Sequence, residues 1–229
     1  MTLTVVPLLR AVRSRRAWLL LAGGAALSLG SAWVQHRHAA PHGADHVLLH
    51  LYGSVAVPLI VFGIVGAVLD GGSLARSGLA MRRLGASPAR VAGSTVLVGI
   101  VLSAITCGAL GAGVAAWAHG AGDPPALRDA LETAGLGAAG GAAYAAYFAF
   151  GGAIGAGAWG RTALIVVDWM VGDGVDVASA LTPRAHLRNL LGGAGPADLA
   201  PVESLASLLC LTLLYAAAAT RLSTLRRRG

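Results

Sequence analysis

The chain has 229 residues, of which 56% are hydrophobic and only 12% are charged. That charged share is about half the usual value for soluble domains, and a soluble protein of this size cannot bury so much apolar surface. The composition argues against a soluble enzyme and against a disordered chain, and it indicates a protein of the lipid bilayer. The basic residues are 17 arginines and no lysine. A conventional P-loop ATPase is excluded, because its phosphate-binding loop requires a lysine.

The first 16 residues mix arginines with leucines and valines. This mixture is typical of an amphipathic helix that lies in the membrane interface, and we expect such a helix over 1–16. The apolar run over 17–34 is long for the hydrophobic region of a signal peptide, and no clear small-residue cleavage site follows it. It predicts a first membrane span.

Five further apolar segments are long enough to cross a bilayer, or nearly so. The fifth predicted span is the weakest, because Asp168, Asp173 and Asp176 interrupt it. The six predicted spans cover residues 17–34, 47–69, 91–118, 134–159, 163–181 and 204–220.

The distribution of arginine supports six spans with both termini in the cytoplasm. With this topology 13 of the 17 arginines lie in the inside segments, together with Asp70 as their only acid, and eight acids lie outside. Such an asymmetry follows the positive-inside rule. The sequence therefore predicts an all-α integral protein of the cytoplasmic (inner) membrane, with residues 1–229 forming a single six-span domain. The basic charge then sets the topology and gives no support for nucleic-acid binding.

Two pairs of glycines, Gly137–Gly141 and Gly151–Gly155, have the small-xxx-small spacing that lets helices approach closely in lipid. They predict either tight packing within one subunit or a dimer face.

The loop after the second span predicts a short cytoplasmic helix over 73–85. Ser73 is a candidate N-cap and Gly85 a candidate terminator, while Ser87 and Pro88 suit the start of the third span.

The apolar Leu74 and Met81 would share one face of this helix, and Arg76, Arg82 and Arg83 would surround them. We expect that face to bind a soluble partner. The alternative is a basic loop that only sets topology.

The order of these elements resembles the permease subunits of type-2 ABC exporters, which have an amphipathic first helix, six spans, a coupling helix between spans two and three, and small extracellular helices before span six. The stretch over 182–203 fits the extracellular segment, with Thr182 as cap, Pro183 as first helical residue and Gly192 as terminator. Asp70-Gly71-Gly72-Ser73 is similar to the acid and Gly-Thr pair that often precedes the coupling helix.

Two other groups share parts of this pattern. Residues 83–87 are similar to the coupling loop of four-span ABC permeases, although this chain lacks their large external domain. The haem exporter B family shares the six-span plan and stays an alternative.

The resemblance implies a permease without enzymatic activity of its own. A separate ATP-binding cassette ATPase subunit would bind ATP and magnesium, and this chain would bind no cofactor. A second permease copy or a homologue would complete a dimeric pathway, and membrane lipids would surround it.

Asp168 is a candidate pathway residue, because acids inside a membrane usually face a cavity or a partner. Tyr144 and Tyr147 are further candidates for the pathway. The alternatives are that Asp168 pairs with Arg161 or with a hydroxyl, and that the tyrosines are packing residues. A proton-coupled transporter that uses Asp168, or a non-transporting assembly subunit, is the alternative function.

Histidines recur every four residues in the first outer loop, at positions 38, 42, 46 and 50. Imidazoles at that spacing can bind zinc or copper, which makes His42, His46 and His50 a candidate metal site. Pro41 and Gly43 interrupt the helix before His46, and the alternative is a polar loop.

Overall fold

The computed structural model describes residues 2–38, 43–120, 125–155 and 157–225, and its described part is all-helical, with 85% helix and no strand. The first half of the chain contains α1 (Thr2–Arg13), α2 (Arg15–His38), α3 (Gly43–Val47), the π-helix η1 (Leu48–Ala56), α4 (Val57–Val68), α5 (Leu74–Ser77) and α6 (Leu79–Arg83). The second half contains α7 (Pro88–Ala118), α8 (Ala126–Ile154), α9 (Trp159–Val171), the 3₁₀ turn η2 (Ser179–Leu181), α10 (Pro183–Leu190), the 3₁₀ turn η3 (Pro196–Asp198) and α11 (Pro201–Leu225).

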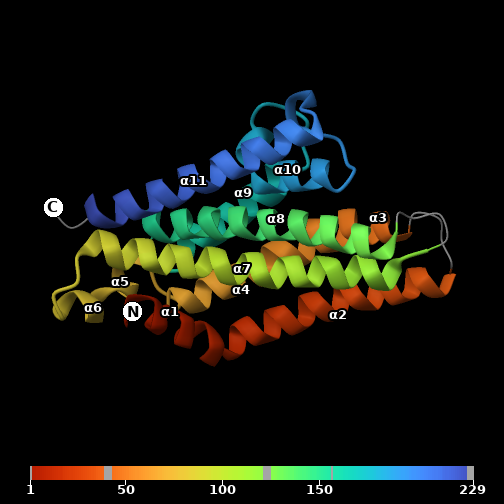
Figure 1. Ribbon diagram of the computed structural model, residues 1–229. Coiled ribbons are helices and arrows are strands. Elements are labelled where there is room, and N and C mark those ends of the chain that lie inside the picture. The colour runs from red at the N-terminus through yellow and green to blue at the C-terminus, as the bar shows by residue number, and fades with distance from the viewer. Residues whose placement is uncertain (1, 39–42, 121–124, 156, 226–229) are drawn as a thin grey trace.

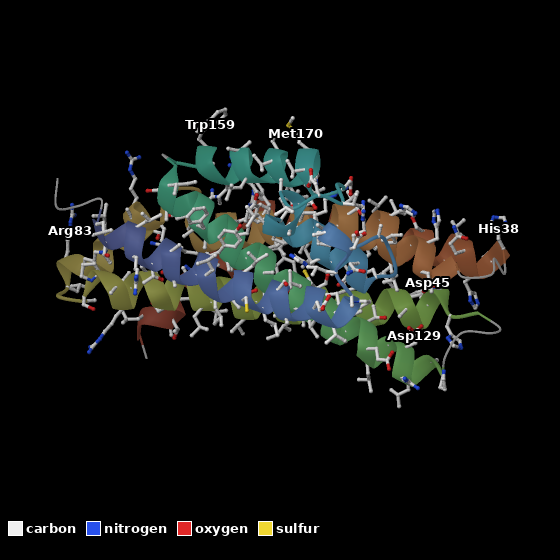
Figure 2. All side chains as sticks on the ribbon, turned by 90° about the horizontal axis from the view of Figure 1, so that it is seen from above. His38, Asp45, Arg83, Asp129, Trp159 and Met170 are labelled. Atoms are coloured by element: carbon white, nitrogen blue, oxygen red, sulfur yellow. The ribbon has the colours of Figure 1, made fainter. Side chains whose placement is uncertain are left out.

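The long helices run side by side along one axis (Figure 1). At one end of the bundle lie α1, α5, α6 and both chain termini, and at the other end lies α3. Figure 2 shows Arg83 at the first of these ends and His38, Asp45 and Asp129 at the opposite one. The first of these ends carries the arginines of α1 and α6, whereas acidic and basic side chains lie together at the opposite end.

Four helices in the described part are long and apolar enough to cross a membrane: α2, the continuous helix Gly43–Val68, α7 and α11. The 29-residue α8 matches them in length but is not among these four candidates. A continuous fifth span over 163–181 is not observed, because α9 ends at Val171 after 13 residues. At about 1.5 Å per residue this helix is roughly 20 Å long, shorter than a bilayer core of about 30 Å.

Two of the predicted helix starts are confirmed. The Ser87 hydroxyl accepts a hydrogen bond from the backbone N–H of Arg90 at 3.4 Å, and Pro88 is the first residue of α7. Thr182 accepts from the backbone N–H of Ala185, also at 3.4 Å, and α10 begins at Pro183.

The predicted helix over 73–85 is instead two short helices. Ser73 stands at the N-cap position of α5, as predicted. The side chain of Ser73 makes no capping bond. Gly78 separates α5 from α6, and the chain there passes so close to α7 that a Cβ at this position would collide with Val91. The predicted end is confirmed, since Gly85 adopts the left-handed conformation with φ 88°. We call residues 74–85, which contain α5 and α6, the elbow.

The glycines of α8 pack within the chain, as the first of the two interpretations expected. A Cβ at Gly141 would lie 2.6 Å from the backbone oxygen of Ser103 on α7, and one at Gly137 would lie 2.8 Å from that of Cys107. Gly151 and Gly155 approach the backbone of Gly160 where α8 turns into α9. The first pair therefore sets the spacing between α7 and α8.

Candidate functional site

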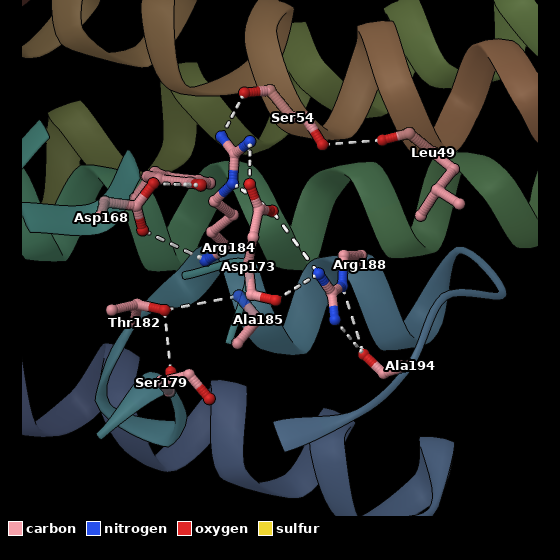
Figure 3. A network of polar contacts seen from close by, with 11 residues as sticks. Leu49, Ser54, Asp168, Asp173, Ser179, Thr182, Arg184, Ala185, Arg188 and Ala194 are labelled. Carbon is pink, nitrogen blue, oxygen red and sulfur yellow. Dashed lines mark hydrogen bonds and ion pairs between the residues drawn. The ribbon is translucent and has the colours of Figure 1, made fainter. Parts of the chain in front are cut away.

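Asp168 lies on α9 and is completely buried. Its Oδ2 accepts a hydrogen bond from the Tyr144 hydroxyl of α8 at 2.9 Å, and its Oδ1 accepts one from the backbone N–H of Arg184 at 3.3 Å (Figure 3). The carboxylate is thus the point at which α8, α9 and the start of α10 meet. The structural partner of Asp168 is therefore a hydroxyl, that of Tyr144, and not Arg161.

Arg184 extends this cluster to the second apolar helix. Its side chain pairs with Asp173 through Nε at 2.8 Å and Nη2 at 3.0 Å, and its Nη1 donates to the backbone oxygen of Ser54 at 2.6 Å (Figure 3). Ser54 belongs to the π-helix η1, and π-helical turns are often found at functional sites.

Arg188, one turn further along α10, holds the end of the same segment. It donates to the backbone oxygen of Asp173 at 2.6 Å and to that of Ala194 at 3.1 Å. The two arginines of α10 therefore bind the irregular segments that precede and follow this helix, at Asp173 and at Ala194. We define Asp168, Tyr144, Arg184, Asp173 and Arg188 as the polar cluster.

His186 ties α10 to α11. The ring is buried, with Nε2 2.8 Å from the backbone oxygen of Ala180 and Nδ1 3.3 Å from the Ser204 hydroxyl, which Asn189 also contacts at 2.7 Å. Burial lowers the pKa of His186, because a charged ring would lose its hydration.

Tyr147 is the third candidate pathway residue, and it faces α9 as Tyr144 does. Its hydroxyl donates to the backbone oxygen of Leu164 at 3.1 Å, and its ring packs edge-on against Tyr215 of α11 at 5.2 Å between centroids. Tyr144 and Tyr147 are both buried, and neither they nor Asp168 line the two cavities described below. Within one copy of the chain this geometry favours packing over a pathway role.

Arg161, the other proposed partner of Asp168, binds elsewhere. Its Nη1 donates to the backbone oxygen of Gly72 at 3.0 Å and its Nη2 to that of Gly71 at 3.4 Å. Arg161 at the start of α9 therefore holds the chain that leads into the elbow. The sequence contained no signal for this contact, because the two segments are about ninety positions apart.

The elbow differs from the prediction in the face that it presents. Leu74 and Met81, the expected apolar contacts for a partner, are only 1% and 8% exposed. Leu74 is buried because α5 packs against α7, α8 and α11. Leu79 and Leu84 are instead 42% and 87% exposed. Of the predicted arginines, Arg76 and Arg83 are exposed and Arg82 is partly buried.

The candidate metal site is only partly visible. The rings of His46 and His50 lie 4.6 Å apart, and both line a cavity of about 590 Å³ at the α3 end. The third candidate, His42, lies outside the described residues. Within the described part, no three His, Cys, Asp or Glu side chains are grouped closely enough to hold a metal ion. The metal site stays a prediction.

Comparison of the chain with protein-family models, with curated proteins and with solved structures finds no match.

Proposed function

We propose that this chain is the membrane-spanning permease subunit of an ATP-driven transporter of the ABC exporter type, with both termini and the elbow in the cytoplasm. ATP would be hydrolysed on a separate ATP-binding cassette subunit, and a second permease copy or a homologue would complete the pathway. Six crossings require α8 to span and α9 to cross together with the irregular segment that follows it. The observation that carries the proposal is the way the elbow is attached.

Three helices of the bundle contact the elbow or the residues just before it. Arg10 of α1 donates to the backbone oxygen of Ser77 at 2.9 Å, and Arg161 of α9 donates to Gly71 and Gly72 just before α5. Gly78 is pressed against Val91 of α7. A force applied to the elbow would therefore reach α1, α7 and α9 through short polar and apolar contacts. This attachment is what a coupling element requires.

The outer side of the elbow has the chemistry of a docking surface. Leu79 and Leu84 are exposed, and Arg76 and Arg83 are exposed beside them in the sequence. Burial of one such leucine contributes about 1.5–3 kcal/mol to binding, whereas an exposed ion pair contributes about 0–1 kcal/mol. We expect the leucines to supply the affinity and the arginines to orient the partner.

The test is purification of the tagged chain from native membranes, followed by measurement of ATP hydrolysis. We expect a protein with a phosphate-binding loop to co-purify, and the complex to hydrolyse ATP while the isolated chain does not, since it has no lysine. Turnover by a homogeneous preparation of the chain alone would contradict the proposal. So would transport activity in reconstituted vesicles that lack any ATP-binding protein.

A further inference from the structure

A cavity of about 690 Å³ opens between α1, α2, α4 and the start of α9. Four of the side chains that line it are arginines: Arg10, Arg13, Arg16 and Arg161. Asp70 is the only acid among the described residues that line it. A cavity of this size suits a small ligand, and the surplus of arginine indicates that the ligand is an anion.

Arg161 is the unusual member of this group, because its side chain is only 2% exposed. Two of its nitrogens bind neutral backbone oxygens, and its Nε has no hydrogen-bond partner in the described part of the chain. No carboxylate among the described residues forms an ion pair with it. A buried guanidinium without a counter-charge is costly, and an anion in the cavity would relieve that cost.

The position of the cavity points to the source of the anion. The exposed side of α1 carries Val5, Leu8 and Val12, and Trp18 follows at the start of α2. Such residues place a helix at the boundary between acyl chains and headgroups, which is the depth of lipid phosphates. Basic pockets between membrane helices on the cytoplasmic side bind anionic headgroups in other proteins.

We propose that this cavity binds a phosphate group, with Arg161 at its base and Arg13 and Arg16 at its mouth. The geometry of α1 favours the phosphate of an anionic lipid, and free phosphate is the other source of the same chemistry. The bound phosphate would neutralise Arg161 and so stabilise the contact of α9 with the chain that leads into the elbow. This proposal does not depend on transport or on an ATPase.

The test is native mass spectrometry of the full chain in a neutral detergent, titrated with phosphatidylglycerol, with phosphatidylcholine and with inorganic phosphate. We expect phosphatidylglycerol to bind more tightly than phosphatidylcholine. Arg13→Gln and Arg16→Gln should each weaken its binding about tenfold, as expected when one charge-assisted hydrogen bond to the phosphate is lost. Both residues are exposed, so neither variant endangers the fold. Arg15→Gln is the matched control, because Arg15 is exposed and does not line the cavity.

Removal of the negative charge of Asp70 should have the opposite effect on the affinity for the anion. Its backbone has φ 56°, a conformation that asparagine tolerates, so Asp70→Asn removes charge alone and should tighten binding. Competition by inorganic phosphate that depends on Arg13 and Arg16 would identify free phosphate as the source, and failure to compete would identify the lipid. The proposal is overturned if neither probe shows dependence on Arg13 or Arg16, or if Arg15→Gln weakens binding as much.

Discussion

At Asp168 both carboxylate oxygens accept hydrogen bonds from the same chain, one from Tyr144 and one from the backbone of Arg184. An acid in an apolar helix can carry protons, or it can hold neighbouring helices together through hydrogen bonds. The hydrogen-bond partners of the acid distinguish the two roles. The sequence identified Asp168 and Tyr144 as separate pathway candidates. It could not show that they bind each other, because that contact depends on how α8 and α9 pack.

Asp168→Asn tests this structural role. Asparagine keeps one oxygen as an acceptor, so we expect the protein to fold and any transport to persist. Asp168→Leu leaves the Tyr144 hydroxyl and the Arg184 N–H without acceptors and should cost about 1–3 kcal/mol of stability. Thermal unfolding in detergent measures both variants. Loss of transport by Asp168→Asn with unchanged unfolding would favour a proton-carrying carboxylate instead.

His186 predicts a pH dependence of stability. Its pKa in the folded protein is lowered by burial, so its contribution is present above the ordinary histidine pKa of about 6.5 and is lost as the pH falls below that value. The melting temperature should fall between about pH 7.5 and pH 5. His186→Gln keeps a donor toward Ala180 but cannot be protonated in this range, and its melting temperature should fall less. An equal fall in both proteins would contradict this assignment.

At the scale of the elements, the local signals were predictable and the contacts between distant segments were not. The starts of α7 and α10 depend on Ser87-Pro88 and Thr182-Pro183, which act within one turn of helix. The close approach of Gly78 to Val91 depends on another helix. The end of α9 lies near two glycines and Asp173, which the sequence shows. The hydrogen bond from Arg184 to Ser54 of η1, which attaches the next segment, could not be predicted from the sequence.

The packing of α7 on α8 can be tested with two neighbouring glycines. A Cβ at Gly137 would collide with the Tyr52 hydroxyl, which donates to the Cys107 oxygen at 2.6 Å, whereas nothing lies within 4 Å of a Cβ at Gly135. Gly137→Ala should therefore destabilise the monomer by about 1–3 kcal/mol. Gly135→Ala should leave stability unchanged or raise it by up to about 1 kcal/mol, because alanine favours helix. If Gly137→Ala altered only oligomeric state, Gly137 would belong to a dimer face instead.

At the scale of the whole molecule, both termini and the elbow lie at one end of the bundle (Figure 1). That placement agrees with the even number of crossings inferred from the arginines, although α9 is too short to cross as a helix. The helical class and most of the long helices could be predicted from apolar length. The apolar side chains that the elbow exposes could not be predicted, because whether Leu74 or Leu84 is exposed depends on how α5 packs against α7, α8 and α11.

The measurement that most directly tests the proposed coupling is the recovery of an ATP-binding subunit with Leu84→Asp. Leu84 is 87% exposed, so the variant should fold while its complex with the ATPase is lost. Leu127→Asp is the matched control, since Leu127 is 74% exposed in the first turn of α8. This turn also contains Asp129, which Figure 2 shows at the end of the bundle opposite Arg83, so the variant should recover the complex as the unaltered chain does. Wild-type recovery of the ATPase by Leu84→Asp would contradict the assignment of the elbow as the docking surface.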